Sequence, residues 1–182
     1  MRTIGDKLEP FRIVGVKPGR LDSADDVFEV LSEKSFPGKW KVIVFYPKDF
    51  TFVCPTEIVA YDKLFQDFAD RDAVLMTGST DNEFCKLAWQ NAHPDLKKIK
   101  HIQFADTQRG DFSLAEQLGV FFKPAGAALR ATFIVDPGNE IQHVTVNNLN
   151  VGRSPEETLR VLDALQTQEL CACNRQVGGE TL

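Results

Sequence analysis

Hydrophobic and polar positions along this chain fall into blocks whose period changes between that of a strand and that of a helix. The first strong block, Trp40 to Tyr46, is β-branched and aromatic with little alternation, and Pro47 ends it. Such a run is typical of a central strand covered on both faces. Apolar residues then recur at helical spacing behind a proline at position 55, which predicts a helix over residues 55–69.

The pattern continues with a strand, a helix and a short strand over residues 73–79, 82–92 and 101–105. A capping-box motif from Ser113 to Glu116 predicts the start of a short helix. Gly119 suits the C-terminal cap of that helix.

Two further strands predict an antiparallel hairpin. Residues 131–136 and 140–146 flank the turn Asp136-Pro-Gly-Asn139, whose central Pro and Gly favour a type II turn. A second capping box, Ser154 to Glu157, begins an amphipathic helix that runs to about residue 168. Strands and helices alternate first and a hairpin follows. This order predicts a thioredoxin-like α/β sandwich, in which helices flank a central mixed sheet that follows an N-terminal extension.

The end of the chain has no hydrophobic periodicity. We therefore expect one thioredoxin-like domain over residues 1–168 and a mobile C-terminal arm over residues 169–182. A chain of 182 residues with 43% hydrophobic content buries enough surface to fold without a disulfide or a metal ion. The four cysteines are then available for chemistry.

Charge and segment lengths restrict the class of protein. The chain has 21 basic and 26 acidic residues, a net charge of -5, which argues against nucleic acid as a partner. The N-terminus is charged throughout, and the longest apolar run, Val42 to Tyr46, is too short to span a bilayer. We expect a cytoplasmic protein without a membrane partner. In a reducing cytosol, cysteines indicate metal binding, redox catalysis or simple burial.

Cys54 is placed where a thiol becomes reactive, between a loop and a predicted helix. The start of a helix favours a thiolate by about 0.3–1 kcal/mol, which is too little to activate a thiol alone. Glu57, one turn further on, would repel the thiolate. Arg130 and Arg153 are candidates to offset that repulsion. The alternative is that Cys54 is only a small buried apolar residue.

The segment Pro47-Lys-Asp-Phe-Thr-Phe-Val-Cys54 resembles the P-x-x-x-T-x-x-C signature of peroxiredoxins. The longer run from Phe45 to Ile58 is similar to the active-site segment of their typical two-cysteine, or alkyl hydroperoxide reductase C, subfamily. Residues 130–136 are similar to the segment that carries the family's active-site arginine, and residues 151–160 to the segment before its last helix. The resemblance extends to about residue 173. It implies an enzyme that reduces hydrogen peroxide and organic hydroperoxides without a metal or other cofactor.

The resemblance also implies roles for single residues. Cys54 would attack one peroxide oxygen, while the Thr51 hydroxyl and the Arg130 guanidinium would donate hydrogen bonds to the reacting atoms. Pro47 would shield the sulfur from bulk water. Glu57 and Arg153 would orient Arg130.

Attack leaves Cys54 as a sulfenic acid, which must condense with another thiol or risk further oxidation. The resemblance implies that Cys171 of a partner chain is this resolving thiol, in a homodimer that assembles into a ring such as a decamer. Cys173 departs from the family pattern. We hypothesise that it passes the disulfide on to a protein dithiol, whether an adaptor, a thioredoxin or a flavoprotein reductase, and the alternative is a spare thiol.

Other chemistries fit the sequence less well. A thioredoxin-type C-x-x-C would need a cysteine at position 57, where Glu57 stands. A zinc site needs four convergent ligands, whereas the chain offers one C-x-C and three scattered histidines, His93, His101 and His143. Cys85 is expected to serve only in packing. A chaperone holdase role alongside the peroxidase remains an open alternative.

Overall fold

The computed structural model of the protein describes residues 1–18 and 24–182, so part of the predicted N-terminal extension, residues 19–23, lies outside the described residues. The strands are β1 (Ile13–Val16), β2 (Phe28–Leu31), β3 (Trp40–Phe45), β4 (Ala73–Ser79), β5 (Ile102–Ala105), β6 (Phe121–Phe122), β7 (Ala127–Ala128), β8 (Arg130–Val135) and β9 (Ile141–Asn147). The helices are α1 (Ala24–Val27), α2 (Cys54–Lys63), α3 (Phe65–Ala69), α4 (Glu83–Ala92), α5 (Leu114–Gln117) and α6 (Pro155–Thr167), with two short 3-10 helices, η1 (Leu96–Lys98) and η2 (Lys123–Ala125).

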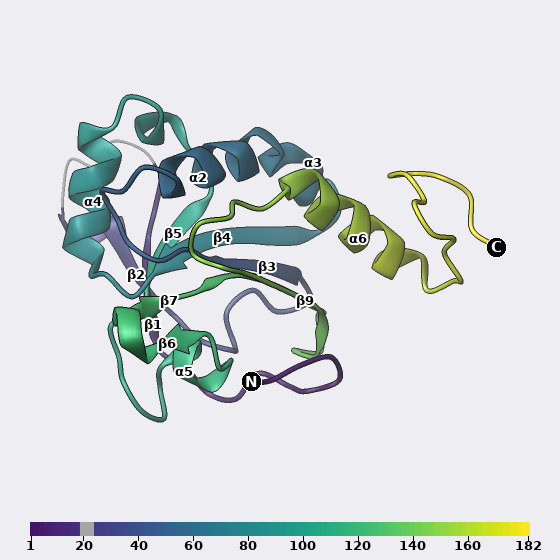
Figure 1. Cartoon of the computed structure of the whole chain (residues 1–182), viewed down its shortest axis with the longest axis horizontal. Coiled ribbons are helices and arrows are strands. Elements are labelled where there is room, and N and C mark those ends of the chain that lie inside the picture. Colours follow the sequence, from purple (N-terminus) through teal and green to yellow (C-terminus); the bar gives the residue numbers. More distant parts are fainter. Residues whose placement is uncertain (19–23) are drawn as a thin grey trace.

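Within the described residues, seven strands form one sheet in the order β2-β1-β5-β4-β3-β8-β9, and β6 pairs with β7 alone. Strands β3, β4 and β5 run parallel to one another, whereas the pairs toward both edges are antiparallel. The sheet is therefore mixed and has helices on both sides (Figure 1). This confirms the predicted thioredoxin-like α/β architecture.

Strand β3 lies in the interior of the sheet, between β4 and β8, and both of its faces are apolar. Val42 and Val44 pack with apolar residues of α2, α3 and α6, including Tyr61, Phe68 and Leu162. Ile43 and Phe45 point to the other face, where the core includes Leu114 and Leu118. Successive side chains of β3 thus point to opposite faces of the sheet and enter two different apolar cores, as the near-continuous apolar run predicts. Among the described helices, none is long and apolar enough to cross a membrane.

The predicted helix over residues 55–69 is wrong in one respect, because it is two helices that meet at Leu64. The Leu64 amide donates to the carbonyl of Tyr61, three residues back, at 3.1 Å, which tightens the turn and interrupts the α-helix. Tyr61 and Phe68 still enter the same apolar core. The hydrophobic period therefore continues through the break, and no Gly or Pro marks it.

The hairpin between β8 and β9 is present, but its turn is not type II. A type II turn needs a positive φ at Gly138, and in the structure the positive φ, 65°, belongs to Asn139 instead. The Asn139 amide donates to the carbonyl of Asp136 at 3.1 Å. A left-handed residue after such a turn matches the twist of the flanking strands, and asparagine tolerates that conformation.

Both predicted capping serines cap their helices. The Ser113 Oγ accepts from the Glu116 amide at 3.2 Å, and the Ser154 Oγ accepts from the Glu157 amide at 3.3 Å. The two glutamate side chains turn to other partners instead of completing the box. Half of each capping box is therefore formed.

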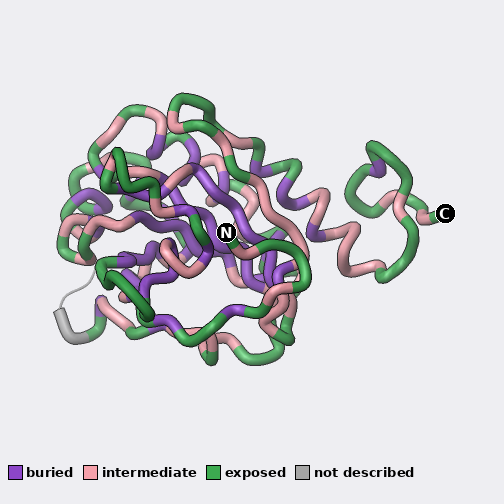
Figure 2. Tube along the Cα trace, turned by 60° about the horizontal axis from the view of Figure 1, so that its bottom comes forward, coloured by how far each residue is buried: buried purple, intermediate pink, exposed green. Residues whose placement is uncertain are grey.

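The C-terminal arm extends beyond α6, and most of it is exposed (Figure 2). Arg175 is the exception, since its side chain is buried and donates to Asp163 on α6 at 2.7 Å. The Gly178 amide donates to the same carboxylate at 2.9 Å, and the Leu182 amide donates to the Leu170 carbonyl at 2.8 Å. The arm is thus folded back on itself and attached to α6.

Candidate active site

Strands β3 and β4 end, and strand β8 begins, at the edge of the sheet where Cys54 lies. Strands β3 and β4 are parallel, so the segments that follow them leave from the same edge. Strand β8 is antiparallel to β3 and pairs Ala131 with Phe45, which places Arg130 beside the start of the loop that leads to Cys54. Residues 76 positions apart in the sequence are thereby brought into contact.

Cys54 is the first residue of α2 and is only 1% exposed. Its sulfur accepts a hydrogen bond from Arg130 Nη1 at 3.5 Å. The side chain belongs to an apolar cluster with Tyr46, Ile58 and Trp89. The start of α2 and the Arg130 guanidinium both place positive potential beside this sulfur, which is itself closed off from solvent.

Glu57 lies between two arginines. Arg130 Nη1 donates to Glu57 Oε2 at 2.6 Å, and Arg153 donates to both carboxylate oxygens, from Nε at 2.9 Å and from Nη2 at 3.1 Å. All three side chains are at most 5% exposed. Two positive charges and one negative charge leave one positive charge in excess, so the repulsion expected from Glu57 is outweighed.

Backbone carbonyl groups fix both guanidinium groups. Arg130 Nε donates to the carbonyl of Leu149 at 2.6 Å, and Arg153 Nη1 donates to that of Ala131 at 2.8 Å. The Arg153 amide also donates to Glu57 at 3.0 Å. The fork of Arg130 is therefore preorganised, with little freedom left to lose when a substrate binds.

The loop before Cys54 carries Pro47 and Thr51, both half-buried. The Thr51 hydroxyl donates to the Lys48 carbonyl at 3.0 Å. Its proton is therefore engaged within the loop rather than directed at the sulfur. The structure brings Cys54, Arg130, Glu57 and Arg153 together as expected, and it places Thr51 in the adjoining loop with its hydroxyl turned aside.

The other cysteines lie elsewhere in the chain, and all four are free thiols. Cys171 follows α6, where its sulfur is 3.5 Å from the hydroxyl of Thr167, and Cys173 is exposed on the arm. The arm and α4 lie at opposite ends of the molecule (Figure 1). Cys85 lies on α4, where burial raises its pKa.

The structure contains a buried polar network beside the loop that leads to Cys54, which the sequence-based expectations do not include. Lys86 on α4 donates to Asp49 at 3.0 Å, to Ser79 at 2.7 Å and to the Tyr46 hydroxyl at 3.2 Å. Burial lowers the pKa of Lys86 although Asp49 opposes this, and burial together with Asp49 raises the pKa of Tyr46 well above its usual value. The sequence contains one indication of this burial. Lys86 lies three and four positions before Trp89 and Gln90, so all three share the buried face of α4.

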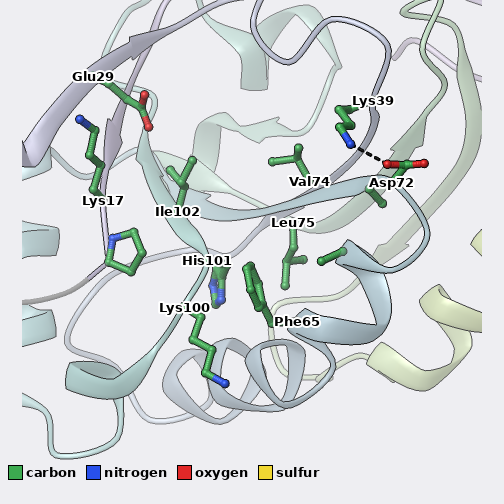
Figure 3. Close-up of a pocket in the computed structure, with 13 residues that line it drawn as sticks. Lys17, Glu29, Lys39, Phe65, Asp72, Val74, Leu75, Lys100, His101 and Ile102 are labelled. Atoms are coloured by element: carbon green, nitrogen blue, oxygen red, sulfur yellow. Dashed lines mark hydrogen bonds and ion pairs between the residues drawn. The ribbon is translucent and has the colours of Figure 1, made fainter.

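A pocket of about 540 Å³ lies at the end of the sheet where β4 and β5 begin (Figure 3). It is lined by apolar residues near the starts of β4 and β5, among them Val74, Leu75 and Ile102, and by the Lys39 and Asp72 ion pair, 2.6 Å long. Cys54 follows the end of β3 instead. None of the described residues that line the pocket is a cysteine, so Cys54 and this cavity are separate features.

In the described part of the chain, no group of three or more His, Cys, Asp or Glu side chains is placed to hold a metal ion. His101 is buried and pairs with Asp62 at 2.7 Å and with Thr77 at 2.9 Å. His143 pairs with Thr145 at 2.7 Å. These contacts give the two histidines structural partners.

A thioredoxin-like fold with one buried thiol at a helix start, beside a fixed arginine, defines a thiol-based redox protein. Residues 5–144 match the AhpC/TSA family, and the chain belongs to it. Alkyl hydroperoxide reductase C of Mycolicibacterium smegmatis is 47% identical to this chain, in a match that covers 99% of this chain and 93% of the relative's length. The solved structure of Mycobacterium bovis AhpC matches with a TM-score of 0.87 and 43% identity over 97% of this chain and 99% of its own. That of the Plasmodium vivax 2-Cys peroxiredoxin, in its reduced form, matches with a TM-score of 0.86 and 33% identity over 98% of this chain and 91% of its own.

Proposed function

We propose that this protein is a thiol-dependent peroxidase in which Cys54 reduces hydrogen peroxide and organic hydroperoxides and thereby protects the cell against oxidative stress. The observation that carries the proposal is the contact of 3.5 Å between Arg130 Nη1 and the Cys54 sulfur, at the start of a helix. Family membership and the names of the relatives, alkyl hydroperoxide reductase and peroxiredoxin, support the same reaction.

In the first step, the Cys54 thiolate attacks one peroxide oxygen and the O–O bond breaks. The other oxygen leaves with the bonding electron pair and takes up a proton as water or an alcohol. Arg130 holds the thiolate and the developing negative charge, while Pro47 limits the access of water. The Thr51 hydroxyl turns from Lys48 to the peroxide when substrate binds.

In the second step, the Cys54 sulfenic acid condenses with Cys171 of a partner chain and releases water. The edge position of β9 supports assembly with a second copy, because an edge strand presents unpaired backbone groups and β9 exposes Val146. We place such dimers in a ring, for example a decamer. The disulfide requires Cα atoms roughly 4.4–6.8 Å apart, so the first turn of α2 unwinds and the arm leaves α6.

The cycle closes when a protein dithiol reduces this disulfide, in a reducing compartment such as the cytosol. Cys173 is exposed two residues beyond Cys171, so both thiols line one cavity between α6 and the arm. We assign Cys173 as the relay that passes the disulfide to an adaptor, a thioredoxin or a flavoprotein reductase.

The variant Cys171→Ser is expected to lose the peroxide-induced covalent dimer, because no other thiol is assigned to resolve Cys54. The measurement is non-reducing electrophoresis after one equivalent of peroxide, with Cys85→Ser as the control that keeps the dimer. A covalent dimer that persists through Cys54 in Cys171→Ser would assign resolution to Cys173 instead.

The variant Cys173→Ser is expected to lower steady-state turnover while it preserves the single-turnover rate with peroxide. The physical reason is that an exposed thiol beside the disulfide exchanges with it without a large movement of the chain. Turnover is measured with saturating reductant, separately for an adaptor dithiol, a thioredoxin and a flavoprotein reductase. An unchanged steady-state rate with all three would make Cys173 a spare thiol.

A further inference from the structure

Lys86 on α4 joins three polar side chains at the edge of the sheet that carries Cys54. Its ammonium lies 3.0 and 3.3 Å from the two carboxylate oxygens of Asp49, and it donates to Ser79 and to the Tyr46 hydroxyl. Both charged side chains are 0% exposed. Well-packed apolar residues often stabilise a fold as well as a buried ion pair does, so stability alone does not account for this pair.

Two of the groups that Lys86 binds belong to the segment that leads to Cys54. Asp49 lies within this loop, and its amide also donates to Asp81 at 2.7 Å. Tyr46 precedes the loop and shares an apolar cluster with Cys54. Lys86 therefore holds the loop both at its start and near its middle.

Apolar contacts from the same helix add to this attachment. Trp89, one turn after Lys86, packs against Tyr46 with ring centres 6.1 Å apart and against Phe50 of the loop at 5.7 Å. Gln103 donates to the Tyr46 hydroxyl at 3.3 Å and accepts from Gln90 of α4 at 2.8 Å. One face of α4 is thus a continuous support for the segment before Cys54.

We propose that Lys86 is a positioning residue that sets how readily the Cys54 segment leaves its folded position. It thereby sets the fate of the sulfenic acid, an inference that rests on the proposed roles of Cys54 and Cys171. The sulfenic acid either condenses with the Cys171 thiol to a disulfide and one water, or attacks a second peroxide, becoming a sulfinic acid as the peroxide is reduced to an alcohol or water.

The direction of the effect follows from the geometry. Peroxide attack needs the folded position, in which Arg130 Nη1 lies 3.5 Å from the sulfur. Disulfide formation needs the unwound position, because the first turn of α2 obstructs a second sulfur. A contact that holds the loop against α4 favours the first step, delays the second, and leaves the sulfenic acid longer in reach of peroxide.

Replacement of Lys86 should therefore change the two steps in opposite directions. In Lys86→Met and Lys86→Gln we expect slower sulfenic acid formation and faster disulfide formation, so that the ratio of sulfinic acid to disulfide falls roughly 5–30-fold. Rapid-mixing kinetics gives the two rates, and intact mass after graded peroxide gives the ratio. Hydrogen exchange of residues 47–57 should rise in the reduced variants.

Lys41→Met is the matched control, since Lys41 is also buried but donates to the carbonyl groups of Lys39 and Asp136 at the other end of β3. It should leave the ratio unchanged. Lys86→Met removes the attachment of the loop and also leaves the buried Asp49 carboxylate without its ion-pair partner. The double variant Lys86→Met, Asp49→Asn removes that carboxylate charge as well, so it reports the effect of the lost attachment alone. If the double variant keeps the altered ratio, the attachment is responsible. If it returns to the wild-type ratio, the proposal is overturned.

Lys86→Gln retains a side chain that donates hydrogen bonds and is the variant to measure if Lys86→Met does not fold. Parallel loss of both rates with no change in the ratio, in a folded variant, would show a merely structural lysine and overturn the inference. A wild-type protein that forms no Cys54 sulfenic acid would overturn the proposed function as well. Normal wild-type chemistry with an unaltered ratio in the variants would overturn this inference alone.

Discussion

Replacement of Cys54 by serine is expected to reduce peroxide consumption to the uncatalysed rate while the fold stays intact. A serine hydroxyl is not ionised at neutral pH, and neither Cys171 nor Cys173 lies beside Arg130. Consumption of hydrogen peroxide and of an organic hydroperoxide is measured with excess reductant. Circular dichroism and thermal unfolding report the fold.

Two controls separate loss of the nucleophile from loss of structure. Cys85→Ser removes a half-buried thiol that lies outside the site and should retain activity. Cys54→Ala avoids burying the serine hydroxyl among apolar neighbours, and it should be as inactive as Cys54→Ser. Rapid turnover in either Cys54 variant would contradict the assignment. A holdase activity needs no thiolate, so its presence in both variants would reveal the alternative role.

Sequence patterns predict the elements of this fold best where a single local cause determines them. The apolar run of β3 and the capping serines depend on neighbours in the sequence, and the structure confirms both. The break at Leu64 and the left-handed Asn139 depend on contacts that the pattern does not contain. Asn139, for example, also donates from its side chain to the carbonyl of Glu33, far away in the chain.

The candidate site divides in the same way. The position of Cys54 between a strand and a helix makes it a candidate nucleophile, and Glu57 makes Arg130 and Arg153 candidate partners. The resemblance to peroxiredoxins is what assigns roles to these residues. Lys86 does not follow from the sequence, because a lysine on a helix is usually exposed. Only the fold shows that its ammonium reaches Asp49, 37 positions away in the chain.

The direction of the Thr51 hydroxyl also could not be read from the sequence. A hydroxyl in a loop has acceptors within a few residues, and here the Lys48 carbonyl is 3.0 Å away. The resemblance to peroxiredoxins assigns Thr51 a partner that arrives with the substrate. In the proposed reaction, this contact with Lys48 is the one that the Thr51 hydroxyl exchanges for the peroxide.

Arg130→Ala is expected to slow sulfenic acid formation by about 10²–10³-fold, the cost of removing one donor from a charge that develops in the transition state. The substitution removes the hydrogen bond to the Cys54 sulfur and lowers the excess charge of the Arg130, Glu57 and Arg153 cluster from one positive charge to none. Arg153 still binds both oxygens of Glu57, so the carboxylate stays paired and the fold is retained.

Arg130→Lys separates charge from geometry. A lysine keeps the positive charge but lacks the planar fork that donates from Nε to the Leu149 carbonyl and from Nη1 to Cys54 and Glu57. If the fixed fork matters, the lysine variant recovers only a small part of the lost rate. Arg2→Ala, which breaks an exposed ion pair with Glu9, is the control for a remote arginine. Single-turnover mixing with peroxide measures the step directly, and an Arg130→Ala rate equal to wild type would place the guanidinium outside the reaction.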